Sequence, residues 1–323
     1  MWVRLPPPGP SSARLYTGDS TSTRKGVAIW RAQPAKLNSP RCSVLSCCAV
    51  LYSNNRPPML PRLSTSLLVF LFAAIAPLHA QDQSASDTPP SPIATDRPTI
   101  TNSSIVVPTG SLQAENGILA TDISGQNILD GPETLLRLGV AAKTELRLTV
   151  PDYYYNLTAG GGPGSGFGDL AAGVKQQLGP TRGGFDVSAT LFLSFPTGAS
   201  GVSSGGYDPG LQVAWSHPLS TNWTAAGQFS LYAPTQGHSH NVTGEPTFFL
   251  DRQLTKPLDA FVEYVADFPE RGGTRQLLHF GASLKLATRQ QLDFHVGAGL
   301  SSAAVDHFFG VGYSFRFQAF HLK

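Results

Sequence analysis

Histidine and acidic side chains in the last third of the chain are of the types that perform acid–base chemistry. His279, Asp293 and His295 fall at alternate positions of two segments, so all three would share the polar face of neighbouring strands. An imidazole beside a carboxylate activates a nucleophile only if a hydroxyl or thiol lies within hydrogen-bonding distance. A strand separates residues i and i+4 by about 13 Å, which keeps Ser283 out of reach of His279. We therefore predict a polar network with no catalytic residue; a lipid hydrolase that uses His279 or His295 is the alternative.

Two further motifs resemble ligand sites, and each lacks a required part. The glycine-rich stretch 160–168 has no Lys-Ser or Lys-Thr after it and no predicted helix, so it fails the phosphate-loop pattern and fits a flexible external loop. His238 and His240 flank a serine in a polar loop, without a third ligand at a suitable spacing. The sequence therefore predicts no metal site and no cofactor.

The composition of the chain excludes several classes of protein. Only 14% of the 323 residues are charged and the net charge is +2, so neither a nucleic-acid-binding stripe nor an acidic tail is indicated. All three cysteines, Cys42, Cys47 and Cys48, precede residue 59. The rest of the chain therefore has no disulfide framework, no zinc-finger spacing and no nucleophilic thiol.

Apolar and polar residues alternate through most of the chain after residue 110, which is the period of β-strands with one apolar face. In 185–195 every odd position is apolar and four of the five even positions are polar. The segments 292–300 and 307–317 repeat this pattern, whereas Phe261 and Val265 break it in 258–268. We predict twelve strands, at 111–121, 133–142, 144–151, 168–178, 185–195, 209–219, 223–233, 246–254, 258–268, 275–286, 292–300 and 307–317.

The connections between these strands alternate in length. Those after even-numbered strands are short, and most of those after odd-numbered strands are longer. Short and long connections therefore gather at opposite ends of a meander, as in outer-membrane barrels with short periplasmic turns and longer external loops. Strands of about nine to eleven residues have the length to cross a bilayer at a tilt. This predicts an all-β fold, a closed antiparallel up-and-down transmembrane barrel of about 12 strands; a soluble, secreted β-sandwich binding protein is the alternative.

The polar face of the strands would line the lumen of such a barrel. We predict a passive conduit, and mixed charge on its inner wall would give it no strong ion preference. The side chains predicted to line the path are Lys175, Asp186, Glu263, Lys285, Asp293 and Arg316, together with His279 and His295.

The stretch 62–80 has the three-part layout of a secretory signal peptide. Arg62 precedes ten apolar residues, 67–76, and Ala80 supplies the small residue before a cleavage site. The apolar run is too short for a membrane-spanning helix, which needs about 20 residues. Export is therefore predicted.

Met1 and Met59 are the two methionines of the chain, and Met59 lies just before the predicted signal. Because 1–58 is rich in proline, serine and arginine, we predict that synthesis starts at Met59 and that 1–58 is disordered upstream sequence assigned to the protein in error. A genuine disordered extension is the alternative. The predicted organisation is 1–58 upstream sequence, 59–80 signal peptide, 81–110 flexible periplasmic lead-in, 111–317 barrel and 318–323 short tail.

Several short motifs resemble a known family. Thr95-Asp96-Arg97-Pro98 is followed by 107–117, which contains a Pro-Thr-Gly turn and a Glu-Asn-Gly strand segment. With 166–170 and 193–198, these residues resemble the outer-membrane transporter family labelled "MetA-pathway of phenol degradation" over about 95–317. The resemblance implies a bacterial outer-membrane barrel that passes aromatic or other apolar small molecules, and it brings no catalytic residues.

The partners implied are outer-membrane lipid, small-molecule solutes and the barrel-insertion machinery, with no nucleic acid; the oligomeric state is left open. Barrels of this kind usually end on an aromatic residue that the insertion machinery reads. This chain continues past Phe317 to Lys323, so either Phe317 or Phe320 serves as that residue or assembly is less efficient than usual.

Overall fold

A computed structural model describes residues 91–158 and 164–320 of the chain. The predictions for 1–58 and for the signal peptide 59–80 lie outside these residues. No helix in the described part of the chain combines the length and the apolar character that a membrane-spanning helix needs.

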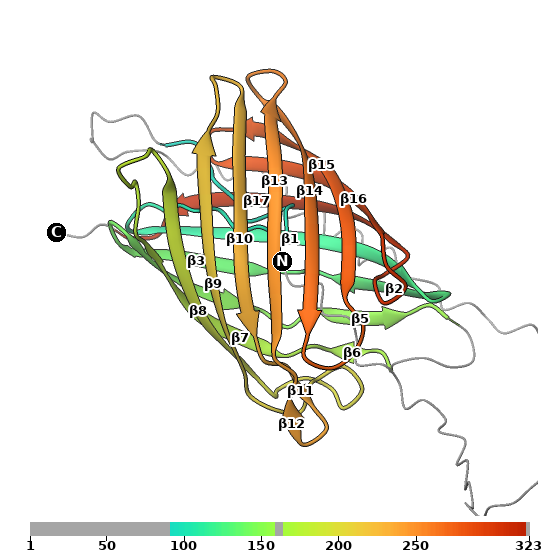
Figure 1. Ribbon diagram of the computed structural model, residues 1–323. Coiled ribbons are helices and arrows are strands. Elements are labelled where there is room, and N and C mark those ends of the chain that lie inside the picture. The colour runs from blue at the N-terminus through green and yellow to red at the C-terminus, as the bar shows by residue number, and fades with distance from the viewer. Residues whose placement is uncertain (1–90, 159–163, 321–323) are drawn as a thin grey trace, which may run out of the picture. The chain divides into compact units, whose positions relative to one another are not determined.

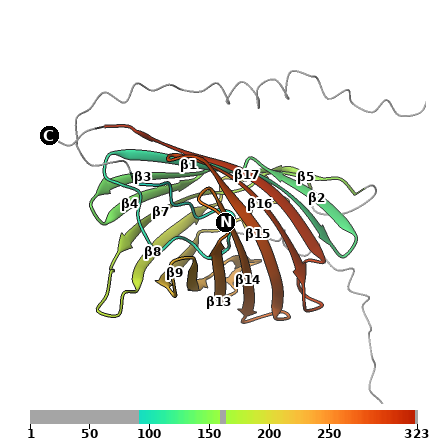
Figure 2. The same ribbon diagram turned by 90° about the horizontal axis from the view of Figure 1, so that it is seen from above.

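The strands form one antiparallel barrel that closes on itself (Figures 1 and 2). β1 (Ser111–Ile123) pairs with β17 (His307–Gln318) from Ser111 opposite Gln318 to Asp122 opposite His307. Pairing between the first and last strands closes the sheet into a ring, which a two-sheet sandwich would not show. The predicted closed barrel is therefore confirmed, and the β-sandwich is excluded.

Twelve strand positions make up the wall, as predicted, and three of them are each divided into two shorter strands: β2 with β3, β4 with β5, and β6 with β7. A small hairpin, β11 with β12, forms a separate sheet. After β1 the bounds are β2 (Gln126–Gly131), β3 (Leu135–Ala141), β4 (Thr144–Thr149), β5 (Tyr153–Asn156), β6 (Gly166–Phe167), β7 (Leu170–Gln177), β8 (Asp186–Phe195), β9 (Asp208–Pro218), β10 (Trp223–Tyr232), β11 (Thr235–Gln236), β12 (Ser239–His240), β13 (Thr243–Gln253), β14 (Leu258–Pro269), β15 (Arg275–Ala287), β16 (Gln290–Gly299) and β17 (His307–Gln318).

The three divided positions are neighbours in the wall, and they are interrupted side by side. Pro132 and Pro151 lie in two of the interruptions, where a missing N–H ends the strand ladder. Single backbone hydrogen bonds still cross each one: Gly117 N–H to Pro132 O (2.7 Å), Val150 N–H to Thr134 O (2.9 Å) and Gly168 N–H to Asp152 O (2.8 Å). The wall is therefore bent in this region but remains hydrogen-bonded.

The stretch 122–132, predicted as a long loop, is mostly strand. β1 turns directly into β2 through Ser124 and Gly125, whose φ angles are 53° and 76°. Two consecutive residues with positive φ form the tight hairpin turn that matches the twist of the strands, and glycine adopts it without strain. A Ser-Gly turn is a weaker signal than Asn-Gly, which is why the sequence did not reveal it.

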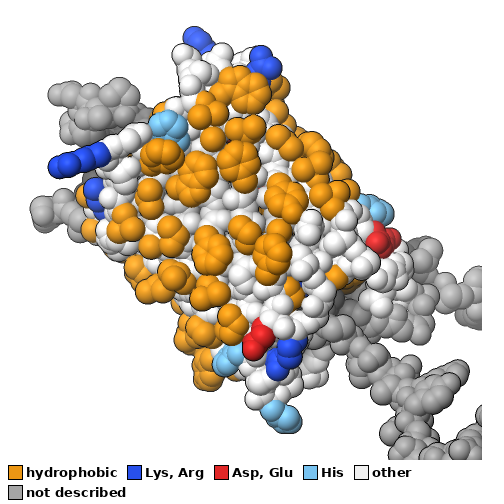
Figure 3. All heavy atoms as spheres, in the orientation of Figure 1, with side chains coloured by type: hydrophobic (Ala, Val, Ile, Leu, Met, Phe, Trp, Pro, Cys, Tyr) orange, Lys and Arg blue, Asp and Glu red, His pale blue; other side chains and the backbone are white. Residues whose placement is uncertain are grey.

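Alternation along each strand separates an apolar outer face from a polar inner face. On β14, Val262 and Tyr264 point outward and are exposed, while Phe261, Glu263 and Val265 point inward and are buried. Figure 3 shows apolar side chains across the middle of one outer face, with charged side chains at its two ends. An apolar exterior around a polar interior is the arrangement of a barrel that lipid surrounds.

Residues 91–110, which we call the plug segment, correct the prediction of a flexible periplasmic lead-in. The segment runs inside the ring of strands (teal in Figure 2), and Asp96, Thr101 and Val107 are almost fully buried. Small polar residues bury nothing useful in a soluble protein, but inside a polar lumen they find hydrogen-bond partners. The remaining residues of the predicted lead-in, 81–90, lie outside the described part of the chain.

Candidate functional site

The plug segment follows the inner wall and hydrogen-bonds to strands all around it. Its contacts in chain order are Ile93 N–H to Thr288 O (2.7 Å), Asp96 and Arg97 N–H to Glu115 Oε2 (2.9 and 3.0 Å), Ile100 and Thr101 N–H to Glu263 (2.9 and 2.7 Å), Asn102 N–H to Gln228 Oε1 (3.0 Å), Ser104 Oγ to Ser216 Oγ (2.7 Å), Val107 N–H to Glu145 Oε2 (2.8 Å) and Gly110 N–H to Gly139 O (2.7 Å). A buried N–H needs an acceptor. Side chains of the wall therefore accept the hydrogen bonds of the plug backbone, as the carbonyl groups of a neighbouring strand do for an ordinary strand.

Both ends of the plug segment lie at the short-turn end of the barrel. Ile93 contacts Thr288 in the turn between β15 and β16, and Gly110 contacts Gly139 near the turn between β3 and β4. Between them, 96–102 reaches the middle of the strands, where Glu263 lies on β14. The plug segment is thus a loop that enters and leaves the lumen on the same side.

Arg137 of β3 is the centre of a buried ionic cluster. Its Nε and Nη2 donate to the two oxygens of Glu145, each at 2.9 Å. Its Nη1 donates to Glu115 Oε1 at 2.9 Å and to the carbonyl oxygen of Ala94 at 3.0 Å. Nη2 also reaches the carbonyl oxygen of Ile105 at 3.1 Å, so Arg137 ties both halves of the plug segment to β1 and β4.

Asp96 is the carboxylate that the plug segment contributes to this cluster. It accepts from Arg147 Nη2 at 2.5 Å, and its Oδ1 lies 3.3 Å from Arg137 Nη1 and 3.4 Å from Lys175 Nζ. Burial opposes its charge, but these three cations outweigh burial and hold the pKa of Asp96 well below its usual range. With Glu115 and Glu145 the cluster has three carboxylates and three cations, a balance that a buried site needs.

Arg97, the next residue, joins the plug segment to the predicted histidine network. Its Nη1 pairs with Glu133 at 2.6 Å, and its Nη2 lies 3.3 Å from Asp293 Oδ1 and 3.4 Å from His295 Nε2. His295 Nδ1 in turn lies 3.0 Å from His279 Nε2. The charge of the plug arginine is therefore matched by carboxylates from two different parts of the wall.

Glu263 completes the chain of contacts, 2.7 Å from His279 Nδ1. One set of tautomers satisfies every contact: Arg97 donates to His295 Nε2, His295 Nδ1–H donates to His279, and His279 Nδ1–H donates to Glu263. In the described part of the chain, neither histidine has a serine or cysteine among its hydrogen-bond partners. The arrangement fixes the plug segment to β14, β15 and β16.

A cavity of about 860 Å³, which we call the vestibule, lies between the plug segment and the long loops. Asp96, Arg97, Ile100 and Asn102 of the plug segment form part of its lining, and Gly237 and other long-loop residues line its opposite end. Its size suits a small organic molecule. The lumen is therefore hollow on the long-loop side of the plug segment.

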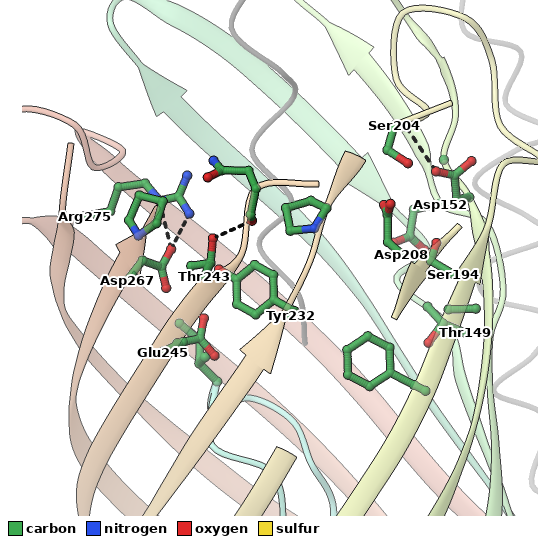
Figure 4. A pocket seen from close by; sticks show the side chains of 18 of the residues that line it. Thr149, Asp152, Ser194, Ser204, Asp208, Tyr232, Thr243, Glu245, Asp267 and Arg275 are labelled. Carbon is green, nitrogen blue, oxygen red and sulfur yellow. Dashed lines mark hydrogen bonds and ion pairs between the residues drawn. The ribbon is translucent and has the colours of Figure 1, made fainter. Parts of the chain in front are cut away.

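The lining of the vestibule combines acidic and apolar side chains. Figure 4 shows Glu245 and Asp267 on one side and Asp152 and Asp208 on the other. The acidic residues of the lining are Asp96, Glu115, Glu133, Asp152, Asp169, Asp208, Glu245 and Asp267, and the basic ones are Arg97, Arg147, Arg271 and Arg275. Large apolar side chains lie between them: Ile123, Ile128, Leu135, Tyr154, Phe192, Val202, Tyr232, Val265, Leu277 and Val305.

The eight side chains predicted to line the path all belong to the inner-facing set, but none of them lines the vestibule. Six are buried: Lys175, Glu263, His279, Asp293, His295 and Arg316. Asp186 and Lys285 are half-buried, and Lys285 pairs with Asp259 at 2.6 Å. Arg316 donates to the carbonyl oxygens of Ser91 and Pro92. Most of these groups hold the plug segment, and their part in transport stays a prediction.

Sequence reasoning missed the residues that make the ionic cluster and the vestibule. Arg137, Glu145 and Arg147 lie in strands where alternation is weak, and Asp96 and Arg97 lie in the segment that was predicted to be flexible. The available signal was the motif Thr95-Asp96-Arg97-Pro98 itself, in which two opposite charges precede a strand. Its partners come from β1, β2–β3, β4, β7 and β16, which no local pattern connects.

Comparisons with known proteins agree with this architecture. A model of the family described as "Putative MetA-pathway of phenol degradation" matches residues 95–317. Among solved structures, an outer membrane channel from Pseudomonas putida F1 is 13% identical with a TM-score of 0.52, and the match covers 68% of this chain and 100% of that chain. A search of curated proteins found no match to the chain.

Two porins are also similar in structure. The NanC porin is 8% identical with a TM-score of 0.46, over 63% of this chain and 98% of that chain. The KdgM porin is 11% identical with a TM-score of 0.43, over 65% of this chain and 99% of that chain. Of the three likenesses, that to the Pseudomonas channel shows that the barrel has the fold of an outer-membrane channel.

Proposed function

The chain belongs to the family described as "Putative MetA-pathway of phenol degradation", and from that premise we propose that it is a bacterial outer-membrane channel for small molecules. The observation that carries the proposal is a closed barrel with an apolar exterior around a vestibule of about 860 Å³. The family and the apolar side chains of the vestibule support solutes with an aromatic or other apolar body. Transport through the hollow lumen would be passive.

The plug segment determines where a solute would cross the lumen. Its first part is held by charge-assisted contacts at Asp96 and Arg97, whereas Asn102 and Ser104 are held by neutral side chains. Hydrogen bonds between ions are roughly twice as strong as neutral ones. We infer that solutes pass on the side of the neutral contacts.

The Asn102–Gln212 contact is the specific point of passage in this proposal. Asn102 Nδ2 donates to Gln212 Oε1 at 2.8 Å, and both residues line the vestibule. A solute that reaches this point can replace an amide hydrogen bond with its own polar group. The step would then need a local displacement of the plug segment while its ionic anchors stay in place.

The test is solute uptake by liposomes that contain the purified full-length chain. Swelling in small hydrophilic solutes such as glycine and arabinose should exceed that of protein-free liposomes. A gel on which the unboiled protein migrates differently from the boiled protein would establish that the barrel has folded. A folded protein that gives no swelling and no current in planar bilayers would overturn the proposal.

A lipid hydrolase built on His279 or His295 gains no support from the geometry. Both side chains are buried on the inner face, where they bond to each other and to Glu263 or Arg97. Lipid acyl chains surround the outer face. The ester bond of a membrane lipid would therefore have to reach the far side of the wall.

A further inference from the structure

Carboxyl groups outnumber guanidinium groups by two to one in the lining of the vestibule, and none of the described lysines or histidines lies there. The acidic groups occupy both sides of the cavity, as Glu245 and Asp267 face Asp152 and Asp208 across it (Figure 4). Glu245 lies beside Asp267, so this pair is counted as a single negative charge. With this pair counted once, the lining still has more acidic than basic groups.

The guanidinium groups of the lining are already engaged with other partners. Arg97 pairs with Glu133 and Asp293, Arg147 with Asp96 and Glu145, and Arg275 with Asp267. Arg271 lies at the exposed rim, where it donates to Ser239 Oγ at 2.8 Å and to His240 O at 2.9 Å. The cations of the lining therefore have little positive charge left to offer a solute.

By contrast, Asp152 and Glu245 form no ion pair with a lysine, arginine or histidine anywhere in 91–158 or 164–320. Asp208 is held by neutral donors, the N–H and the hydroxyl of Thr235, each at 2.8 Å. The lining of the vestibule therefore holds more carboxyl groups than guanidinium groups that could pair with them.

A second observation, independent of the charge count, also points to a ligand that donates hydrogen bonds. Asn102, which is 5% exposed, has a buried Oδ1 with no hydrogen-bond partner among the described residues. The same holds for one oxygen of Asp152. Both atoms are acceptors on residues that line the vestibule. A buried acceptor without a donor is costly, and an ammonium group supplies three donors.

Apolar side chains give the vestibule room for the rest of such a molecule. Phe192 of β8 and Tyr232 of β10 belong to the lining, with Tyr154 of β5. Aromatic faces attract cations as well as apolar groups. The cavity therefore offers a carboxylate and an aromatic surface within one enclosed space.

Resting on the proposed channel function, we propose that the vestibule selects solutes that carry a positive charge on a compact aromatic or apolar body, such as arylalkylamines, over carboxylates of the same shape. A cleft lined by one sign of charge, with walls of low dielectric constant, raises the local concentration of counter-ions by about tenfold or more. This replaces the expectation from sequence of no ion preference. Four of the six wall charges that it counted, Lys175, Glu263, Asp293 and Arg316, are in fact bonded to the plug segment.

The test compares three probes of similar shape by calorimetric titration of the full-length protein in detergent: 2-phenylethylammonium, 2-phenylethanol and 3-phenylpropionate. The ammonium should bind tightest and the carboxylate weakest. The preference should shrink as salt is added, because screening weakens it. This comparison needs no variant, so it decides the matter even if a substitution disturbs folding. If the carboxylate binds as tightly as the ammonium, the proposal is wrong.

Substitutions then locate the preference in the vestibule. Asp152→Asn and Asp208→Asn keep the side-chain shape and should each lower the affinity for the ammonium by about tenfold. Asp251→Asn is the matched control, because Asp251 lies on the inner-facing set of β13 but does not line the vestibule. Unchanged affinity in both vestibule variants would also contradict the proposal.

Uptake into liposomes separates this inference from the proposed function. If the ammonium and the carboxylate enter at equal rates, the proposed channel function is supported and the proposed selectivity is contradicted. If neither probe enters although the ammonium binds, the proposed channel function is contradicted and the proposed binding site is supported. Faster uptake of the ammonium supports both.

Discussion

Gly117 of β1 lies directly opposite Gly312 of β17 at the closure of the barrel, and the side chain of Arg97 occupies the space above both. A Cβ atom at either position would overlap with the guanidinium group. The seam that closes the barrel is therefore also the place where the plug arginine is seated. This explains why a Glu-x-Gly pair, Glu115 and Gly117, follows the Thr-Asp-Arg-Pro motif: the glutamate binds its backbone and the glycine makes room for its side chain.

Gly117→Ala and Gly312→Ala should displace Arg97 from Glu133 and Asp293. Overpacking of this kind costs about 1–3 kcal/mol, so the free energy of unfolding by urea in lipid vesicles should fall by that amount. Gly244→Ala on β13 is the control, because a Cβ there meets only the ring of Phe229 at ordinary contact distance. Equal losses in all three variants would show that Arg97 is not the cause.

Arg137→Met should destabilise the protein more than any other change in the ionic cluster. It leaves Glu115, Glu145 and Asp96 without the cation that contacts all three. Removal of one partner from a buried ion pair costs about 3–5 kcal/mol, measured here by urea unfolding. Arg182→Met, in an exposed turn, is the control. A loss below that of ordinary surface substitutions would mean that the cluster is hydrated.

Asp96→Asn gives a prediction that depends on pH. The pKa of Asp96 is held well below its usual range, so its charge stabilises the folded state at any pH above the ordinary carboxyl pKa of about 3.9. The difference in unfolding free energy between wild type and variant should be constant from neutral pH down to about pH 5. It should narrow as the pH falls below about 3.9 and vanish below the depressed pKa. A difference that changes around pH 7 would assign the effect to another group.

His279→Leu tests whether the histidine network holds the plug segment or does chemistry. The variant loses the contacts to Glu263 and His295, but Glu263 keeps the two N–H donors of Ile100 and Thr101. We expect a loss of about 1–3 kcal/mol in unfolding free energy and no change in lipid composition by mass spectrometry. If a lipid product present with the wild type is missing with the variant, the lipid hydrolase hypothesis is supported instead.

The outer face of the barrel could be predicted from the sequence, and the contents of its lumen could not. Residues that face lipid must be apolar at every second position, so segments such as 185–195 and 292–300 revealed their strands directly. Phe261 and Val265 broke the pattern because they face inward and are buried near the plug segment, where Phe261 contacts His279. Inward-facing positions can be either polar or apolar, so the requirement for apolar residues applies only to the face that contacts lipid.

The plug segment was beyond prediction because its partners are remote in the chain. Ile100 donates to Glu263, 163 positions away, and Arg97 meets Asp293, 196 positions away. In water, a proline-containing run of small polar residues buries no apolar surface and is expected to be flexible. Inside a closed barrel, inward-facing carboxylates accept hydrogen bonds from its backbone, and these contacts order the segment. The resemblance of the Thr-Asp-Arg-Pro motif to a family indicated its importance without its physical role.

Asn102→Ala and Gln212→Ala test the proposed point of passage. Each removes the same neutral contact between the plug segment and β9, so each should raise the rate of solute uptake by liposomes while the ionic anchors at Asp96 and Arg97 keep the barrel stable. The double variant should gain little over either single one, because both remove one shared interaction. Ser188→Ala is the control, since its buried hydroxyl has no hydrogen-bond partner in the described part of the chain. Uptake that stays at the wild-type rate in both single variants would move the path elsewhere in the lumen.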